Sequence, residues 1–304
     1  MSSTLARRTL PASDAPVMVI GGGSADAAWL SLRAHHGSTP ATDLLAADQL
    51  TTGHDRPLYV EPFSAEDLPA IAEHADGVLI GAAWMQDFQL VRACARLGLP
   101  VIVQRGPAAT LTEWLAIADY CVAEGNDQVI LCESGTRTHP DHLTLDFTLM
   151  RAARLRSGRP VVADVSHDPT LATAAIAAGA DGLLLAADAT AAEVEAVRDS
   201  VTLVAAVTRR ERPDTLPGCR AAIDRVDAAL ATLLAHRAEL ACVVQSLKPV
   251  GGFAGRDMER ERALVAAMAE RAPDLGEAGL APIMNAVIEA GLRLAEERRR
   301  AAGN

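Results

Sequence analysis

The sequence predicts two domains of different fold class: an α/β domain with parallel strands, followed by an all-helical domain. Two observations indicate this division. From about Val17 to Val207, short apolar runs alternate with Ala- and Leu-rich stretches, which is typical of strands alternating with helices. After a polar segment at 208–217, the strand pattern ends and apolar residues recur every three or four positions. We therefore expect domains at 1–207 and 218–304, joined by a linker at 208–217.

The first domain contains apolar runs that fit buried strands. They are VMVIG (17–21), PLYVEP (57–62), GVLIGA (77–82), PVIVQRG (100–106), QVILCESG (128–135), PVVADVSH (160–167) and GLLLAA (182–187). Strands of this kind are covered on both faces, as parallel strands packed between helices are. In such folds the chemistry lies at the carboxyl ends of the strands. Those ends here carry Gly21–Ser24, Gln104–Arg105, Glu133, Arg137 and Asp164–His167.

The second domain is predicted to hold three helices. A long helix covers 218–248, and two further helices cover about 257–271 and 280–299. Three helices with one dominant long member bury little apolar surface by themselves. We therefore expect the long apolar stripe to be covered by a second copy of the chain, in a homodimer formed through the helical domain.

Composition excludes several classes of protein. The net charge of −11 over 304 residues argues against binding to nucleic acid, which relies on clustered Lys and Arg. No apolar run approaches the roughly 20 residues needed to cross a bilayer, and the first twenty residues lack the apolar core of a signal peptide. The five cysteines form no CxxC pair, which favours reduced, buried thiols. We expect a cytoplasmic protein that binds neither nucleic acid nor membrane.

Charged residues on the first two predicted helices could form a site for an anion. Arg237 lies inside the apolar stripe, where a charge is costly unless it meets an anion. Arg237 and Lys248 share a helix face to within about 20°, whereas Arg220 lies about 100° around the helix from Arg237. On the second helix, Asp257 and Glu261 are four residues apart and repel each other unless a cation or hydroxyl lies between them. Taken alone, this charged string is more typical of a solvated helix face.

The stretch CRAAIDRVDAALATLLAHRAELACVVQSLK, followed by GRDMERER, resembles the all-helical class of chorismate mutase. The resemblance covers roughly residues 216–297, and it implies a dimeric enzyme that converts chorismate, a small dicarboxylate, to prephenate. The site residues that it implies are Arg220, Arg237, Lys248, Asp257, Arg260 and Glu261.

The resemblance also implies a role for each of these residues. Arg237 and Arg220 of the partner subunit would bind the substrate carboxylates, with Arg260 assisting. Lys248 would stabilise charge on the breaking ether oxygen, while Asp257 and Glu261 would position the ring hydroxyl. This pericyclic rearrangement needs no cofactor, because the protein only holds the reactive conformer and places cations where negative charge develops.

One part of the expected mutase site is missing. In the third helix the family usually has Ser and, four residues later, Gln or Glu, and the latter acts with the lysine on the ether oxygen. The aligned positions here are Gly291 and Ala295. Losing one such donor typically lowers the rate by about 100- to 1,000-fold. Glu296 is adjacent, but one residue is about 100° of helix, so it would need a local shift.

The segment from about 56 to 187 resembles the short type of DAHP synthase, a (β/α)8 barrel enzyme that condenses phosphoenolpyruvate with erythrose 4-phosphate. The matching strings are IGAAWMQDFQL, VIVQRGPAATLTEWLAIADYCVAEGNDQVILCESGTRT, VVADVSH and AAIAAGADGLLL. Fusions of this synthase to a chorismate mutase are a known arrangement, so the two resemblances support each other. A barrel is therefore the expected fold of the first domain. The short spacing between VMVIG and PLYVEP predicts that its second strand is shortened or missing.

The resemblance leaves the synthase chemistry depleted. The family's metal-binding Cys falls at Gly23 and its metal Glu at Ala186, so that only its metal His is kept, as His167. One ligand cannot hold a divalent ion, so we expect no metal and no synthase activity. The phosphoenolpyruvate lysine is replaced by Gln104. Two arginines of the family persist and would form a residual anion site, Arg105 and Arg137.

Two features of this domain have a functional and a structural interpretation. His167 is either a relic metal ligand or a hydrogen-bonded histidine at a strand end, and we expect the second. The GGGS segment at 21–24 is either a phosphate-binding nest or a tight turn, and we again expect the second, since no full GxGxxG pattern is present.

The sequence thus favours a chorismate mutase whose barrel domain is a non-catalytic scaffold or a regulatory module. Three alternatives remain open. The chain could be a catalytically decayed protein that binds chorismate, or it could catalyse pyruvate elimination from isochorismate in the same helical fold. The least favoured alternative is a retained synthase activity.

Overall fold

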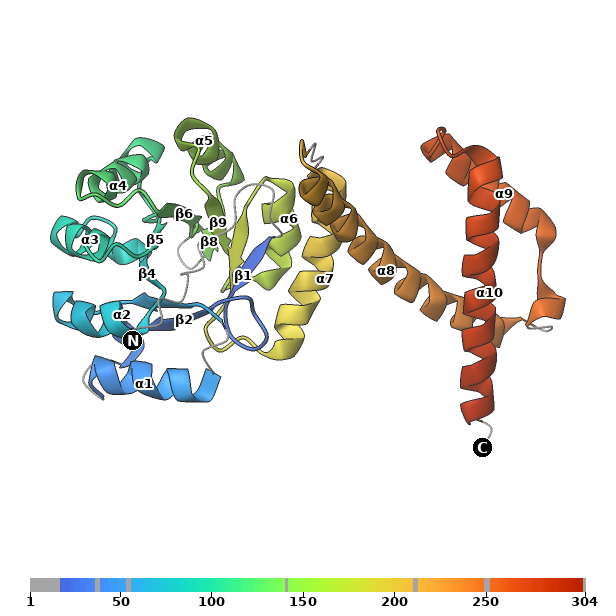
Figure 1. The fold of residues 1–304 in the computed structure, drawn as a ribbon, viewed down its shortest axis with the longest axis horizontal. Helices are drawn as coiled ribbons and strands as arrows, with labels where there is room; N and C mark the ends of the chain where they lie inside the picture. Colours follow the sequence, from blue (N-terminus) through green and yellow to red (C-terminus); the bar gives the residue numbers. More distant parts are fainter. Residues whose placement is uncertain are drawn as a thin grey trace. The chain divides into compact units, whose positions relative to one another are not determined.

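The computed structural model describes residues 17–35, 39–52, 56–139, 142–209, 213–248 and 252–302. The chain divides into two compact units, Met1–Arg225 and Val226–Asn304. The first unit is built on parallel strands and the second on helices (Figure 1), as the change of periodicity predicts. Each unit is described by itself below.

The described part of the first unit contains an 8-stranded parallel sheet. Its strands, in spatial order, are β1 (Met18–Ile20), β10 (Gly182–Leu184), β9 (Val161–Asp164), β6 (Val129–Glu133), β5 (Val101–Gln104), β4 (Gly77–Ile80), β3 (Leu58–Glu61) and β2 (Ala28–Ser31). A parallel bridge between Ile20 and Ala27 joins the two ends of this order. The sheet is therefore a nearly closed barrel.

The expectation of a missing or shortened second strand is wrong. Strand β2 has four residues, as β3 does, and it pairs with β3 over its whole length. What is short is the connection between β1 and β2, residues 21–27, which contains no helix. The GGGS segment in this connection is a tight turn against the end of β10. A Cβ atom on Gly22 would lie 2.5 Å from the carbonyl oxygen of Ala189, so only glycine fits there.

Each later strand of the barrel is followed by a helix, and these helices surround the sheet in Figure 1. They are α1 (Ala41–Thr52), α2 (Leu68–His74), α3 (Phe88–Ala95), α4 (Leu111–Ala123), α5 (Phe147–Ser157), α6 (Ala172–Ala177) and α7 (Ala191–Thr208). Capping boxes begin α4 at Thr110 and α7 at Thr190, where each hydroxyl accepts a backbone N–H. A short hairpin, β7 (Thr136–His139) and β8 (His142–Thr144), follows β6.

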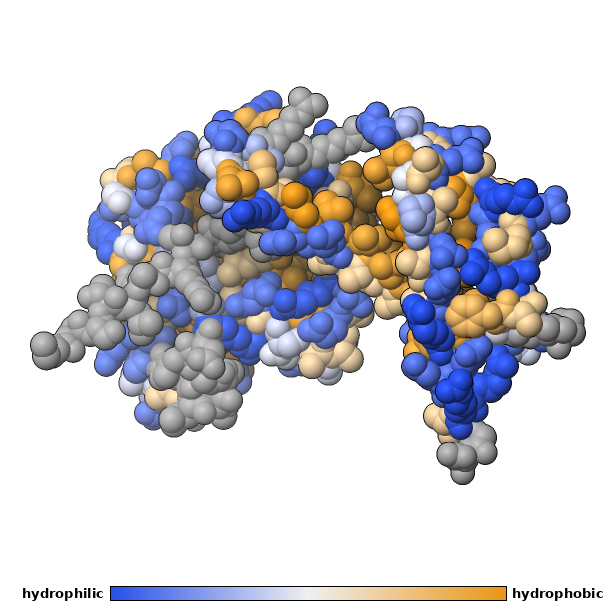
Figure 2. Space-filling view, turned by 45° about the vertical axis from the view of Figure 1, so that its right-hand side comes forward, coloured by the Kyte–Doolittle hydropathy of each residue, from blue (hydrophilic) through white to orange (hydrophobic). Residues whose placement is uncertain are grey.

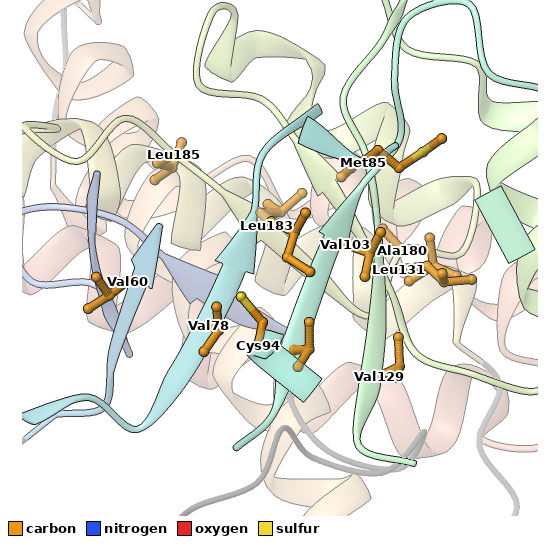
Figure 3. Close-up of a cluster of buried hydrophobic side chains, with 14 of the residues drawn as sticks. Val60, Val78, Met85, Cys94, Val103, Val129, Leu131, Ala180, Leu183 and Leu185 are labelled. Atoms are coloured by element: carbon orange, nitrogen blue, oxygen red, sulfur yellow. The ribbon is translucent and has the colours of Figure 1, made fainter. Parts of the chain in front are cut away.

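The barrel has two apolar layers. The outer layer lies between the strands and the helices. Figure 3 shows part of it, with Val78, Val103 and Leu131 on neighbouring strands and Cys94 of α3 in the same cluster. The inner layer fills the barrel with side chains of alternate strand residues, among them Ile20, Tyr59, Leu79, Ile102, Ile130 and Leu184. The interior is therefore a packed core rather than a channel, and any ligand site must lie at its carboxyl end.

The second unit contains most of a long helix and two further helices. These are α8 (Leu216–Leu247), α9 (Met258–Arg271) and α10 (Gly276–Ala302), close to the predicted ranges. Val265 of α9 and Leu280 and Met284 of α10 form a small buried cluster. Helix α10 is long and apolar enough, by length and composition alone, to cross a membrane. Leu280 and Met284 of this helix are buried against α9, whereas Ile283 is exposed.

Helix α8 is 32 residues long, and of its described side chains only Ala229 is buried. Its large apolar side chains are about half exposed, and they add to the apolar surface seen in orange in Figure 2. They are Ile223, Val226, Leu230, Leu233, Leu240, Val243, Val244 and Leu247. We call this set the α8 stripe.

Candidate functional site

A folded loop between α8 and α9 brings several predicted site residues together. Lys248 directly follows α8, and its Nζ donates a hydrogen bond to the carbonyl oxygen of Gly255 at 2.8 Å. Asp257 is the N-cap of α9, and its side chain accepts the backbone N–H of Arg260 at 3.0 Å. Since the backbone of Gly252 also donates to Gln245 at 2.7 Å, the loop is held against the end of α8.

Glu261, on the first turn of α9, is held by an arginine that sequence reasoning missed. Arg256 donates from Nε to Glu261 Oε1 at 3.0 Å and from Nη2 to Glu261 Oε2 at 2.6 Å. Its Nη2 also donates to Asn285 of α10 at 2.7 Å, and Nη1 lies 3.6 Å from Glu289. Its partners on α10 lie about thirty residues further along the sequence, which is why no local pattern marks Arg256.

The charges around Glu261 keep it ionised. The hydrogen bonds from Arg256 lower the pKa of Glu261, partial burial opposes this, and the charges of Arg256 and Lys248 lower it further. The charge of Asp257 acts in the other direction. The pKa of Arg256 is raised by the same pairing. Arg256 therefore holds Glu261 as a carboxylate of fixed charge at the start of α9.

The other predicted cations lie outside this cluster. Arg237 is half-buried in the middle of α8. Arg220 is exposed, on the part of α8 that belongs to the first unit. Within the described ranges neither side chain makes a hydrogen bond or an ion pair, so both are free to meet an anion. Arg260 is exposed on α9.

The two positions that lack the expected donor, Gly291 and Ala295, lie on the inner side of α10. Ala295 is only 5% exposed, and a Cβ atom on Gly291 would lie 3.2 Å from the Cβ of Ala241 on α8. Glu296 instead reaches the loop, since a Cβ atom on Gly252 would lie 2.9 Å from Glu296 Oε1. On this turn of α10, Glu296 therefore places a polar side chain beside the loop between α8 and α9.

In the barrel, the prediction that Arg105 forms part of a residual anion site is wrong. It is 1% exposed and forms a bidentate ion pair with Glu133, at 2.5 and 2.7 Å. Its remaining N–H groups donate to Thr136 and to the carbonyl oxygens of Gly106 and Ala109. All five donors of the guanidinium are thus used within the protein. Only Arg137, exposed on the β7–β8 hairpin, remains accessible.

Of the positions that the DAHP synthase resemblance aligns with metal ligands, only His167 has a donor side chain. Gly23 and Ala186 have no donor side chain, and His167 is exposed. Asp164 is engaged by Gln104 at 3.0 Å and by Ser166 at 2.6 Å, and burial raises its pKa. Across the described ranges, no three His, Cys, Asp or Glu residues are grouped as metal ligands. The donor set therefore does not fit the divalent ion of a DAHP synthase.

A second polar cluster at this end follows the strand that the sequence did not reveal. Ser31, at the end of β2, donates to Glu61 Oε2 at 2.5 Å, and Arg33 lies 3.5 Å from Glu61 Oε1. The guanidinium carbon of Arg33 lies 3.7 Å from the ring centroid of Trp84. Burial raises the pKa of Glu61. Glu61 thus accepts a hydrogen bond from Ser31, whereas Arg33 Nε is buried and pairs with Glu61 by charge without a hydrogen bond.

The fold and this arrangement define a nearly closed (β/α) barrel joined to a helical domain with a cationic loop. Comparison with known families agrees: the DAHP synthetase I family matches residues 3–199, and chorismate mutase type II matches residues 219–296. The chain therefore belongs to the DAHP synthetase I family and carries a C-terminal chorismate mutase type II domain.

Two individual relatives each match less than half of this chain. A phospho-2-dehydro-3-deoxyheptonate aldolase of Thermotoga maritima is 37% identical over 139 residues, which is 42% of this chain and 41% of that protein. A 2-dehydro-3-deoxyphosphooctonate aldolase of Acidithiobacillus ferrooxidans is 29% identical over 147 residues, 42% of this chain and 52% of that one. The chain thus spans about half or less of the length of these curated relatives.

Two solved structures share the fold. The crystal structure of the Thermotoga maritima DAHP synthase matches with a TM-score of 0.57 at 23% identity, covering 63% of this chain and 69% of that one. A truncated form of the Thermotoga maritima enzyme matches with a TM-score of 0.51 at 22% identity, covering 63% and 87%. At these identities the likeness supports the barrel fold and nothing further.

Proposed function

We propose that the chain is a chorismate mutase that converts chorismate to prephenate in the cytoplasm, and that its barrel has no synthase activity. The observation that carries this proposal is the chorismate mutase type II match over residues 219–296. It contains the loop in which Lys248 contacts Gly255 and Arg256 holds the carboxylate of Glu261. A pericyclic rearrangement needs only a held conformer and well-placed cations, which this set of residues can supply.

In this proposal the side chains act on different parts of chorismate. Arg237 and Arg220 of the partner subunit bind the two carboxylates, for which unpaired guanidinium groups are suited, and Arg260 assists. Lys248 leaves the carbonyl of Gly255 to stabilise negative charge on the ether oxygen. Glu261 and Asp257 accept hydrogen bonds from the ring hydroxyl. No metal and no organic cofactor enters the reaction.

The same proposal requires a homodimer formed through the helical domain. Residues 223, 226, 230, 233, 237, 240, 244 and 247 of α8 follow one another at alternating spacings of three and four, the pattern of a helix seam. All but Arg237 belong to the α8 stripe, which the described part of the chain leaves exposed. A second copy would cover it and would bring in Arg220.

For the barrel, we propose a scaffold or regulatory role. Its support is the donor set described above: two ligand positions without a side-chain donor, a glutamine in place of lysine at Gln104, and Arg105 fully paired with Glu133.

The test is a chorismate-depletion assay on the full chain, with products separated by chromatography. We expect prephenate as the product and a loss of at least about 100-fold for Lys248→Ala, the usual cost of removing a transition-state donor. Full-length protein that leaves chorismate unchanged at high concentration would exclude the proposal. Salicylate and pyruvate formed from isochorismate would assign the chain to the lyase alternative instead.

A decayed chorismate-binding protein is the second candidate, and the small residues at Gly291 and Ala295 favour it. Calorimetry would then show binding without turnover. In that case Ala295→Gln should gain activity by restoring a donor, although overpacking this buried position costs about 1–3 kcal/mol of stability. A substitution that leaves the rate unchanged means that the missing donor is not the limiting defect.

A further inference from the structure

Arg256 is not among the residues that the chorismate mutase resemblance carries over, yet among the described residues of the loop it makes the most polar contacts. It donates two hydrogen bonds to Glu261 and one to Asn285, and it lies 3.6 Å from Glu289. Asn285 in turn donates to Glu289 at 3.0 Å. The side chains of Arg256 and Glu261 are each 17% exposed, so the pair is largely withdrawn from solvent.

This geometry fixes the plane of the Glu261 carboxylate. A bidentate guanidinium contact sets both the position and the rotation of its partner, which a single point charge does not. Each carboxylate oxygen accepts one hydrogen bond from Arg256 and retains acceptor capacity for another donor. Glu261 can therefore stay paired with Arg256 and still accept a hydroxyl of a bound ligand.

We propose that Arg256 is the positioning residue that orients Glu261 toward the ring hydroxyl of the substrate, and that Asn285 and Glu289 hold Arg256 from α10. This inference rests on the proposed function, because it gives Glu261 its ligand. It assigns to α10 a part in the site, exerted through Arg256, that does not need a donor at Ala295.

The charged groups that face Glu261 are Arg256 and Asp257 beside it and Lys248 at the end of α8. Glu289 faces Arg256 from α10. Removing Arg256 withdraws the strongest of the influences that lower the pKa of Glu261. The carboxyl group should then take up its proton at higher pH, and a carboxylate needed for binding should be lost at that higher pH.

The experiment compares Arg256→Gln with wild type in the full chain. We measure kcat/KM against pH and titrate the Glu261 carboxyl by carbon-13 NMR, identifying its resonance by its loss in Glu261→Gln. We expect kcat/KM at neutral pH to fall about 10- to 100-fold, the usual effect of losing hydrogen bonds to a charged group. The acid limb of the profile and the carboxyl titration should both move to higher pH. Arg256→Lys should restore the titration more than the rate, since it keeps the charge without the bidentate contact.

The matched control is Arg293→Gln. The side chain of Arg293 is 59% exposed and lies 3.8 Å from Glu289. Its substitution therefore removes one arginine charge from the neighbourhood without changing a contact of Glu261. This variant should keep the wild-type profile, whereas Asn285→Ala should shift it as Arg256→Gln does, but less. An Arg256→Gln protein that loses activity with an unmoved acid limb and carboxyl titration overturns the inference. If wild-type protein leaves chorismate unchanged, the proposed function fails, and the carboxyl titration still decides whether Arg256 controls Glu261.

Discussion

Arg105 and Arg137 show that two arginines near one strand end can have opposite roles. Arg105 is enclosed with Glu133 in the barrel, while Arg137 is exposed on a hairpin. Arg105→Met should destabilise the protein by about 3–5 kcal/mol, because it leaves the Glu133 carboxylate buried without its cation. Arg137→Met, the control, should change stability by no more than about 0.5 kcal/mol. Urea unfolding measures both, and equal small losses would contradict a structural role for Arg105.

Glu61 should make the stability of the barrel depend on pH. Burial raises its pKa above the unfolded value, so the folded state holds the proton more tightly. Its contribution to stability is therefore greatest below the unfolded pKa and declines as pH rises through the folded pKa. We expect Glu61→Gln to flatten this part of the stability profile. Urea midpoints measured across that window check it, and a decline as steep as that of wild type would exclude Glu61 as its source.

At the scale of single elements, α8 is the helix whose exposed side chains most need a partner. Leu240→Glu places a charge in the α8 stripe and should convert the proposed dimer to a monomer, with loss of mutase activity, because the proposed site includes Arg220 of the partner subunit. Ala235→Glu lies on the same helix outside the stripe and should leave both unchanged. Light scattering after gel filtration gives the mass. A wild-type monomer that turns over chorismate would contradict the dimer proposal.

At the scale of the whole molecule, we expect that neither stability nor activity depends on a divalent metal ion. Since the described part of the barrel contains no group of metal ligands, we expect that chelators alter neither the melting temperature nor the proposed conversion of chorismate. Added manganese with phosphoenolpyruvate and erythrose 4-phosphate should release no phosphate. Phosphate release dependent on both substrates would show that the barrel retains its chemistry.

Sequence patterns predicted most of this architecture, and the exceptions have physical reasons. Uninterrupted apolar runs marked seven barrel strands, whereas β2 reads AWLS and carries a polar residue that serves Glu61. The three helices were predicted because their apolar spacing is regular over many turns. Side-chain pairing escaped prediction, since Arg105 meets Glu133 and Arg256 meets Asn285 across separations of 28 and 29 residues. Sequence shows which groups are charged, but only the fold shows which charges are already neutralised.

If the proposed dimer forms through the α8 stripe, the position of Arg237 within that stripe would link assembly to substrate binding. Burying the unpaired Arg237 cation in an interface costs free energy unless an anion binds to it. A bound dicarboxylate would therefore stabilise the interface between the two copies. By mass action, chorismate should then tighten the dimer, and specific activity should rise with protein concentration until the chain is fully paired. Substrate supply and enzyme abundance would thus act on a single equilibrium.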